Sequence, residues 1–284
     1  MLKPDSLQRA LEDRDYLLDG AQALSVSIAL HLEKPLLIEG PAGVGKTELA
    51  KALSLALDAP LIRLQCYEGL GEEKALYEWN YAKQLLHIQA DGNKPWDELS
   101  ADVFSQKYLM ERPLLRSIRS AKRAVLLVDE LDRVDEEFEA FLLELLSDFQ
   151  ITIPELGTIA ALHKPVVVLT SNATRELGEA LRRRCIYLYM DFPNLERERD
   201  IIVRKVPGIA QTLAQHVAAT VQRLRTQGLR KPPSISETLD WAAVLCAMGV
   251  QRLDGRVFED TAGALLKHKA DLERLEQLRS LVSG

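Results

Sequence analysis

Short apolar runs recur along the first two thirds of this chain and are separated by stretches with helical spacing. Runs of this length and composition are typical of strands that are buried on both faces of a parallel sheet. They lie at residues 35–38, 61–65, 124–130, 165–170 and 186–190. The alternation of strand and helix patterns predicts an α/β domain in which helices flank a parallel sheet.

Apolar residues at helical spacing predict two helices around these strands. One extends over residues 15–32 and the other over residues 135–148. In the second helix the apolar positions share one face, which leaves the acidic residues Glu136, Glu137 and Glu139 on a solvated side.

Two further segments look like extended chain. Residues 150–159 predict a short β-hairpin without a large apolar face of its own, so we expect an interaction element. Tyr77, Trp79 and Tyr81 alternate with polar residues and predict an exposed hairpin or extended segment with one aromatic face. Two alternatives stay open for that face, which can contact a partner or pack against its own domain.

The pattern changes after residue 191, where strand signals stop and helical ones continue. Helices are predicted at residues 196–205, 209–226, 236–249 and 258–282, with glycine, proline and basic residues between them. We therefore divide the chain into an αβ domain of residues 1–192 and a smaller all-helical domain of residues 193–284.

Composition narrows the class of protein. The chain has 284 residues, of which 47% are apolar and 27% charged, an ordinary globular balance. No apolar run reaches the roughly 18 residues that span a bilayer, and the first residues lack a signal-peptide core, so we expect a cytoplasmic protein without a transmembrane segment. The cysteines lie far apart, which favours reduced thiols without a metal site. A net charge of −6 argues against a broad nucleic-acid surface, although a local basic patch is compatible with it.

A complete phosphate-binding loop follows the first predicted strand and opens a helix. Its glycines let backbone N–H groups turn toward a polyphosphate, and the helix N-terminus adds partial positive charge. In this motif the lysine reaches the β- and γ-phosphates and the threonine holds Mg²⁺. The candidate nucleotide-binding residues are Gly40, Pro41, Ala42, Gly43, Val44, Gly45, Lys46, Thr47 and Glu48.

Two adjacent carboxylates, Asp129 and Glu130, end the third apolar run. Ligands gather at the carboxyl ends of parallel strands, so these side chains are candidates for the chemistry of a bound triphosphate. Asp129 is placed to hold Mg²⁺ or its water, and Glu130 to polarise the attacking water. Arg133 can either reach a neighbouring subunit or pair locally with Asp132 or Glu136.

The next strand ends at Asn172, whose amide can hydrogen-bond the γ-phosphate or orient the water; a simple turn former is the alternative. Three arginines, at residues 182–184, then precede the last strand. They form either a solvated corner or a source of an arginine finger for a neighbouring subunit's nucleotide. Spacing alone does not settle which arginine acts.

These motifs, in this order, resemble those of the AAA+ ATPases, and two further stretches resemble the MoxR-type members. The stretches are residues 63–86, which begin Arg-Leu-Gln-Cys-Tyr-Glu-Gly, and residues 111–115, Glu-Arg-Pro-Leu-Leu. Within that type the chain looks most similar to members associated with aerobic carbon monoxide dehydrogenase.

The resemblance implies a fold, an activity and partners. The fold is a P-loop αβ domain with inserted β-hairpins, one of which can project into the pore of a ring, followed by a helical lid. The activity is hydrolysis of ATP with Mg²⁺, and Tyr16 and Leu17 are candidates for contact with adenine, with packing of their helix as the alternative. The arginine finger that the resemblance implies is Arg184, which directly precedes the strand, with Arg183 as the second choice. The partners are further copies in a hexameric ring, a client metalloenzyme containing molybdenum, and a protein with a von Willebrand factor A domain.

One part of the chain departs from the family pattern. AAA+ lids offer an arginine at the start of their third helix, where this chain has Ser-Ile-Ser-Glu at residues 234–237. That segment is a capping box, and the carboxylate of Glu237 would repel phosphate. Arg230 and Lys231 are close enough in sequence to replace the missing arginine.

Three competing functions remain on the same sequence. A nucleic-acid motor would need basic pore hairpins, whereas Glu78 and Glu155 are acidic. A P-loop kinase for a small molecule fits the Asp-Glu pair, the arginines and the helical lid poorly. A scaffold that binds ATP without turning it over conflicts with the intact Lys46, Asp129 and Glu130.

Overall fold

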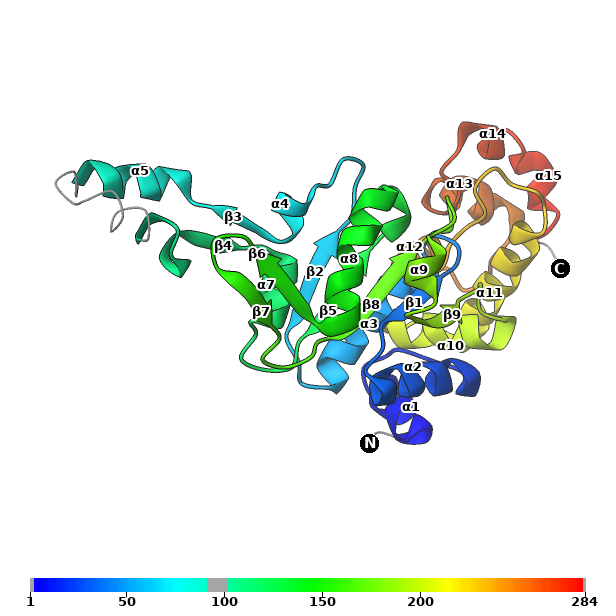
Figure 1. Ribbon diagram of the computed structural model, residues 1–284. Coiled ribbons are helices and arrows are strands. Elements are labelled where there is room, and N and C mark those ends of the chain that lie inside the picture. Colours follow the sequence, from blue (N-terminus) through cyan, green and yellow to red (C-terminus); the bar gives the residue numbers. More distant parts are fainter. Residues whose placement is uncertain (1–2, 91–101, 283–284) are drawn as a thin grey trace. The chain divides into compact units, whose positions relative to one another are not determined.

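The computed structural model describes residues 3–90 and 102–282. Its main sheet has five parallel strands in the order β2-β5-β8-β1-β9 (Figure 1). Since the order is not sequential, helical crossovers connect the strands, as in other open α/β sheets. The strands are β1 (Leu36–Glu39), β2 (Leu61–Gln65), β5 (Val125–Asp129), β8 (Val166–Ser171) and β9 (Ile186–Tyr189). The predicted α/β class and parallel sheet are confirmed.

The two strands β5 and β8 lie side by side in the sheet, and all of their residues are buried. This burial explains why their sequences are almost uninterrupted runs of valine and leucine. The register pairs Gln65 with Asp129 and Val128 with Leu169, so the polar residues at these strand ends lie along one edge of the sheet.

Helix α8 (Glu136–Asp148) follows β5, and it has the predicted bounds to within one residue. The side chain of Asp135 caps its N-terminus by accepting from the N–H of Phe138 at 2.9 Å. The prediction that Glu139 faces solvent is wrong. Its side chain is buried, forms an ion pair with Arg175 and accepts the N–H of Gly178 at 2.8 Å.

The predicted helix over residues 15–32 is also wrong in its first turn. The structure has α1 (Pro4–Glu12), which was not predicted from the sequence, and α2 (Gly20–Leu32). Between them Asp15 adopts φ +55°, a left-handed conformation that a helix cannot continue through. Residues 15–19 are therefore a connection, and their side chains are available for other contacts. Other helical elements with described bounds before β9 are α3 (Lys46–Ala56), α4 (Glu72–Ala75), α5 (Tyr81–Ala90), η1 (Gln106–Tyr108), α7 (Pro113–Ile118), η2 (Leu131–Arg133) and α9 (Glu179–Arg182).

Two antiparallel hairpins accompany the main sheet. In the first, β3 (Tyr77–Trp79) pairs with β4 (Leu109–Glu111), and α5 projects from its end in Figure 1. Trp79 is buried, so it packs within its own domain. Tyr81 lies on α5 and is 68% exposed, so the prediction of a single aromatic face through Tyr81 is wrong.

The second hairpin pairs β6 (Gln150–Ile153) with β7 (Gly157–Ala160), as the sequence predicts. The sequence predicts no large apolar face on this hairpin, but two of its side chains are part of the core. Ile151 and Ile153 are buried and belong to the same apolar cluster as residues of β5 and β8. The hairpin is therefore anchored by burial on one side.

After β9 the chain is entirely helical within the described residues. Trp241 and Phe258 meet edge-on at the centre of this region, and the indole N–H of Trp241 donates to Thr261 Oγ1 at 2.8 Å. The predicted helix over residues 258–282 is wrong, because Leu266 is extended and buried and ends the first of three short helices. The helices are α10 (Leu195–Lys205), α11 (Gln211–Arg225), α12 (Ile235–Ala247), α13 (Gly255–Leu265), α14 (Lys269–Leu272) and α15 (Leu275–Arg279).

The residues group into two compact units. One comprises Met1–Leu7, Gly20–Glu39 and Thr47–Tyr189, and the other comprises Gln8–Asp19, Gly40–Lys46 and Met190–Gly284. The phosphate-binding loop thus clusters with the helical region rather than with the sheet. No helix within residues 3–90 and 102–282 is long and apolar enough to cross a membrane.

Candidate nucleotide-binding site

The phosphate-binding loop connects β1 to α3, as the sequence predicts. Gly43 has φ +74°, and a Cβ there would lie 2.4 Å from Ser234 Oγ, so only glycine fits. A Cβ on Gly40 would lie 1.9 Å from the carbonyl oxygen of Met190. These two glycines of the motif are therefore required by the close approach of residues from the helical region as well as by the turn itself.

Lys46 is the first residue of α3, and its side chain extends back over the loop. Its Nζ donates to the carbonyl oxygens of Gly40 and Pro41, at 2.7 Å each. Although the residue is only 6% exposed, the ammonium group is satisfied by these oxygens. The arrangement holds a positive charge at the helix N-terminus, where a phosphate group is favoured.

Asp129 ends β5 with a carboxylate that is almost completely buried. It accepts from Thr47 Oγ1 at 3.0 and 3.2 Å, from Thr170 Oγ1 at 2.5 Å, and from Arg63 Nε and NH2 at 3.1 and 2.6 Å. These donors fix the position of the carboxylate. The two predicted Mg²⁺ ligands, Thr47 and Asp129, are thus in direct contact.

A hydroxyl and a carboxylate are hard oxygen ligands that suit Mg²⁺. The described residues contain no cluster of three or more histidine, cysteine or acidic side chains that could hold a metal by itself. Mg²⁺ itself binds through one or two carboxylates together with the phosphates of a substrate. The donor set at Thr47 and Asp129 therefore fits that ion.

Glu130 is held differently from its neighbour. Its backbone is left-handed, with φ +57°, and its N–H donates to Thr170 Oγ1 at 3.0 Å. Its carboxylate pairs with Arg133 Nε at 2.5 Å and is about one third exposed. Arg133 therefore pairs locally, but with Glu130 rather than with Asp132 or Glu136.

The backbone of Asn172 is fixed by Asp132, a residue that was not predicted to shape the site. Asp132 Oδ1 accepts the N–H of Asn172, and Oδ2 accepts the N–H of Thr174, at 3.1 Å each; Oδ2 also accepts the Thr174 hydroxyl at 2.6 Å. Burial raises the pKa of Asp132, but the hydrogen bonds from Thr174 and from the backbone outweigh it and lower the pKa below its ordinary 3.8. An ionised Asp132 thus joins the segment after β5 to the segment after β8.

The three arginines before β9 have separate environments. Arg182 pairs with Glu39 at 3.0 Å, and Arg184 donates to Ser147 Oγ at 2.7 Å and to the carbonyl of Ala180 at 2.8 Å. Arg183 is exposed, and its side chain makes no hydrogen bond or ion pair with another described residue. Of the three arginines, Arg183 is therefore the one whose guanidinium has no hydrogen-bond or ion-pair partner among the described residues.

Tyr16 and Leu17 lie in the connection before α2. The hydroxyl of Tyr16 donates to the carbonyl oxygen of Gly45 in the phosphate loop, at 3.0 Å. The carbonyl of Leu17 accepts from Arg197. Packing of a helix onto the sheet, the alternative role for these residues, does not apply, because they lie outside α2.

The capping box at the start of α12 is present as predicted. Ser234 and Glu237 cap each other's backbone N–H groups, and Lys231 Nζ pairs with Glu237 at 2.7 Å. Burial raises the pKa of Glu237, but the bonds from Lys231 and Ser234 lower it overall. The Lys231 side chain therefore neutralises Glu237, and Arg230 is the cation of this segment without such a pair among the described residues.

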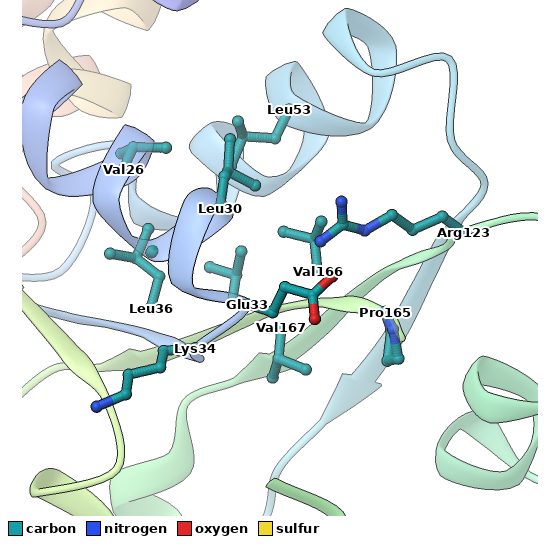
Figure 2. A pocket seen from close by; sticks show the side chains of 12 residues that line it. Val26, Leu30, Glu33, Lys34, Leu36, Leu53, Arg123, Pro165, Val166 and Val167 are labelled. Atoms are coloured by element: carbon teal, nitrogen blue, oxygen red, sulfur yellow. The ribbon is translucent and has the colours of Figure 1, made fainter. Parts of the chain in front are cut away.

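A separate apolar pocket lies at the amino ends of the strands, where β1 and β8 begin. Figure 2 shows Leu36 and Val166 among its lining, with Val26 and Leu30 from α2 and the charged Glu33. Glu33 pairs with Lys164 at 3.0 Å. Because ligands of open α/β sheets gather at the opposite, carboxyl ends of the strands, we assign this pocket no part in nucleotide binding.

Comparison with known proteins identifies the family. The family described as AAA domain (dynein-related subfamily) matches residues 35–185 of the chain. The protein belongs to this AAA family. The matched part includes the phosphate loop, the strand that ends in Asp129 and Glu130, and Asn172. Membership implies a nucleotide-binding P-loop ATPase.

Relatives of this AAA protein span most of its length at low identity. An uncharacterized protein of Staphylococcus epidermidis is 23% identical over 257 residues, which cover 86% of this chain and 90% of the relative. The denitrification regulatory protein NirQ of Pseudomonas aeruginosa is 26% identical over 198 residues, 67% of each chain. The structure of a variant of Thermotoga maritima RuvB covers 93% of this chain and 72% of that one, with 18% identity and a TM-score of 0.50, and shares the fold.

Proposed function

We propose that this AAA protein binds ATP with Mg²⁺ at its phosphate loop and hydrolyses it. The observation that carries the proposal is the contact between the two predicted magnesium ligands, Thr47 and Asp129. Thr47 directly follows Lys46 in the sequence, so this contact lies next to the lysine of the phosphate loop. In this proposal residues 40–48 hold the nucleotide, Lys46 contacts the β- and γ-phosphates, and a bound Mg²⁺ would neutralise their charge. Glu48 lies in the first turn of α3, and its carboxylate pairs with Lys51 at 2.5 Å.

Glu130 is the proposed base that polarises the attacking water. Its carboxylate lies beside Arg133 and is partly exposed, so it can reach a water that Asp129 cannot. Asp129 is buried beside Thr47 and would instead hold Mg²⁺ or a water bound to it. Two adjacent carboxylates thus have two roles because their environments differ. Asn172, which Asp132 holds at the next strand end, is proposed to contact the γ-phosphate or the same water.

We further propose that the site is completed by an arginine from a second copy. AAA membership suggests an oligomeric ring, for which we expect six subunits. Arg183 is now the preferred finger over Arg184, since Arg184 is used by Ser147 and Ala180 within its own chain. An exposed guanidinium without a local partner can approach a neighbour's nucleotide without breaking an existing bond.

The proposed client is another protein, in particular a molybdenum enzyme such as carbon monoxide dehydrogenase, with a von Willebrand factor A domain protein as a further partner. The NirQ relative is named as a regulatory protein of denitrification, and regulation fits an action on another protein. Exposed apolar residues on α5, namely Tyr81, Leu85 and Leu86, offer a surface for such a client.

Nucleotide binding is tested with Lys46→Ala and a matched surface variant, Lys51→Ala. Lys51 pairs with Glu48 on the exposed face of α3, so its loss leaves the loop intact. Calorimetric titration with ATP and Mg²⁺ should give binding to wild type and Lys51→Ala and none to Lys46→Ala. Equal affinity of all three proteins would overturn the assignment of the loop.

The client is tested by capture. Glu130→Gln should hold ATP without turnover and retain the client during purification, whereas Lys46→Ala/Glu130→Gln, which cannot load ATP, should not. Recovery of the molybdenum enzyme from both variants equally would contradict an ATP-dependent action on it. Salt-sensitive stimulation of the ATPase by DNA would support the competing nucleic-acid motor instead.

A further inference from the structure

Two carbonyl groups of the phosphate loop are bound by donors from outside the loop. The carbonyl oxygen of Gly43 accepts the backbone N–H of Ile235 at 3.2 Å. The carbonyl oxygen of Gly45 accepts the hydroxyl of Tyr16 at 3.0 Å. Tyr16 precedes α2, and Ile235 is the first residue of α12, so two segments distant in sequence hold alternate peptide units of one loop.

These bonds fix the direction of two N–H groups. In a planar trans peptide the C=O and the following N–H point in opposite directions. When Gly43 directs its carbonyl toward Ile235, the N–H of Val44 is directed away from Ile235. In the same way the bond from Tyr16 turns the N–H of Lys46 away from Tyr16. A phosphate loop works by presenting such N–H groups to a polyphosphate.

The segment that carries Ile235 is itself held firmly. Glu198 is fully buried and accepts both terminal nitrogens of Arg225, at 2.6 and 2.7 Å. Arg225 Nε donates to the carbonyl of Pro233 at 2.8 Å, next to the capping residue Ser234. The side chain of Ser234 occupies the space that a Cβ on Gly43 would need. The start of α12 is therefore a fixed support against which the loop rests.

We infer that the Tyr16 hydroxyl and the Ile235 amide are positioning groups that set the phosphate-binding conformation of the loop. They touch the loop's carbonyls rather than the nucleotide, so they act equally on any polyphosphate ligand. The inference rests on the proposed nucleotide site and deepens it. It also gives the helical region a link to the nucleotide at the position where the family's lid arginine is absent, since α12 is bonded to the loop itself.

The test for Tyr16 is Tyr16→Phe, which removes only the hydroxyl and keeps the ring. Affinities are measured for Mg²⁺-ATP, Mg²⁺-GTP and Mg²⁺-tripolyphosphate, with Tyr67→Phe, an exposed tyrosine on another loop, as the matched control. Loss of one hydrogen bond predicts that Tyr16→Phe binds all three about 3- to 10-fold more weakly, by the same factor. The control should bind as wild type does.

Two outcomes overturn this inference. Unchanged affinity for all three ligands means that the hydroxyl does not position the loop. A loss confined to ATP means that Tyr16 contacts adenine, because tripolyphosphate has no base. A purely structural role would lower the melting temperature of the ligand-free protein and leave the ratio of variant to wild-type affinity near one for tripolyphosphate.

The Ile235 amide is tested with a proline, which is tolerated at the first position of a helix. Ser234 is extended, with φ −82° and ψ 175°, as the residue before a proline must be. Ile235→Pro removes the N–H donor and places a carbon against the carbonyl of Gly43. Ile235→Val keeps the N–H and measures how much the change of side chain alone alters the affinity. The inference requires tripolyphosphate affinity to be at least about 3-fold weaker in Ile235→Pro than in Ile235→Val.

Equal affinity of these two variants overturns the role of α12. Absence of ATP binding to the wild-type protein is a different result, because it overturns the proposed function itself. The two failures are thus distinguished by the wild-type titration alone.

Discussion

At the scale of single residues, environment separates side chains that the sequence presents as equivalent. Asp129 and Glu130 are adjacent carboxylates, but Asp129 is buried among hydroxyl and guanidinium donors while Glu130 is partly exposed beside Arg133. Arg63 is a partner of Asp129 that the sequence analysis did not identify. It lies two residues before Gln65, which pairs with Asp129, so its side chain is on the same face of the sheet as that pair. The period of two within β2 predicts that Arg63 and Gln65 share a face, but it does not predict that Asp129 is the residue that Arg63 contacts.

Asp132 gives a prediction at this scale. Asp132→Asn keeps the size of the side chain but has one acceptor oxygen in place of two, so it cannot accept from both Asn172 and Thr174, and the Asn172 segment loses its fixed position. We expect the turnover of ATP to fall about 10- to 100-fold with nucleotide affinity unchanged. Steady-state kinetics with a parallel titration measures both, and Asp148→Asn at the exposed end of α8 is the control. Unchanged turnover in Asp132→Asn would show that this loop does not need its anchor.

The same residue predicts a dependence of stability on pH. The pKa of Asp132 is lowered in the folded protein, so its contribution is fully present above the ordinary value of 3.8 and is lost as the pH falls through the folded pKa. Between about pH 5 and about pH 3 the melting temperature of wild type should therefore decrease more than that of Asp132→Asn. An equal decrease in the melting temperature of the two proteins over this pH range would contradict the lowered pKa of Asp132.

At the scale of elements, strands were predictable and connections were not. The five strands of the main sheet follow from local apolar runs, because a strand buried on both faces must be apolar throughout. The start of α2 and the breaks between α13, α14 and α15 depend on single backbone conformations, such as those of Asp15 and Leu266, that apolar spacing does not encode. The burial of Ile151 and Ile153 likewise depends on where the hairpin packs, which is a tertiary property.

The hairpin of β3 and β4 gives the prediction for elements. Trp79 is buried and meets Tyr77 and Phe104 edge-on, with ring centroids 6.0 and 5.5 Å apart. Trp79→Ala should therefore lower the free energy of unfolding by about 3–5 kcal/mol, whereas Tyr81→Ala, on exposed α5, should change it by less than about 0.5 kcal/mol. Urea denaturation followed by circular dichroism compares them. Similar stability of the two variants would mean that Trp79 is not part of the core.

At the scale of the whole molecule, the motifs predict the chemistry but not the supports around them. The phosphate loop is recognisable because its motif has a fixed spacing, and Asp129 because it ends a buried apolar strand. The contacts of Tyr16, Ile235 and Asp132 join segments that are far apart in sequence, and no local pattern marks them. The role of the arginines belongs to this scale too, since it involves a second copy of the chain.

Mixing experiments test the contribution of a second copy. Arg183→Ala should bind ATP as wild type does and lose most of its turnover, while Arg184→Ala should retain more of it. Because a Lys46→Ala subunit still carries Arg183, mixing it with Arg183→Ala should restore part of the ATPase activity. No recovery in the mixture, together with a monomeric mass by light scattering in the presence of ATP, would exclude a site shared between subunits.

The central claim is that this chain hydrolyses ATP at its phosphate loop with Glu130 as the water-polarising base, and Glu130→Gln tests it most directly. The change removes the base and keeps the shape of the side chain, so the binding of Mg²⁺-ATP should match wild type while turnover falls by about 100-fold or more. Glu155→Gln, in the exposed turn between β6 and β7, is the matched control and should alter neither binding nor turnover. Hydrolysis by Glu130→Gln at the wild-type rate, with ATP binding intact, would contradict the claim.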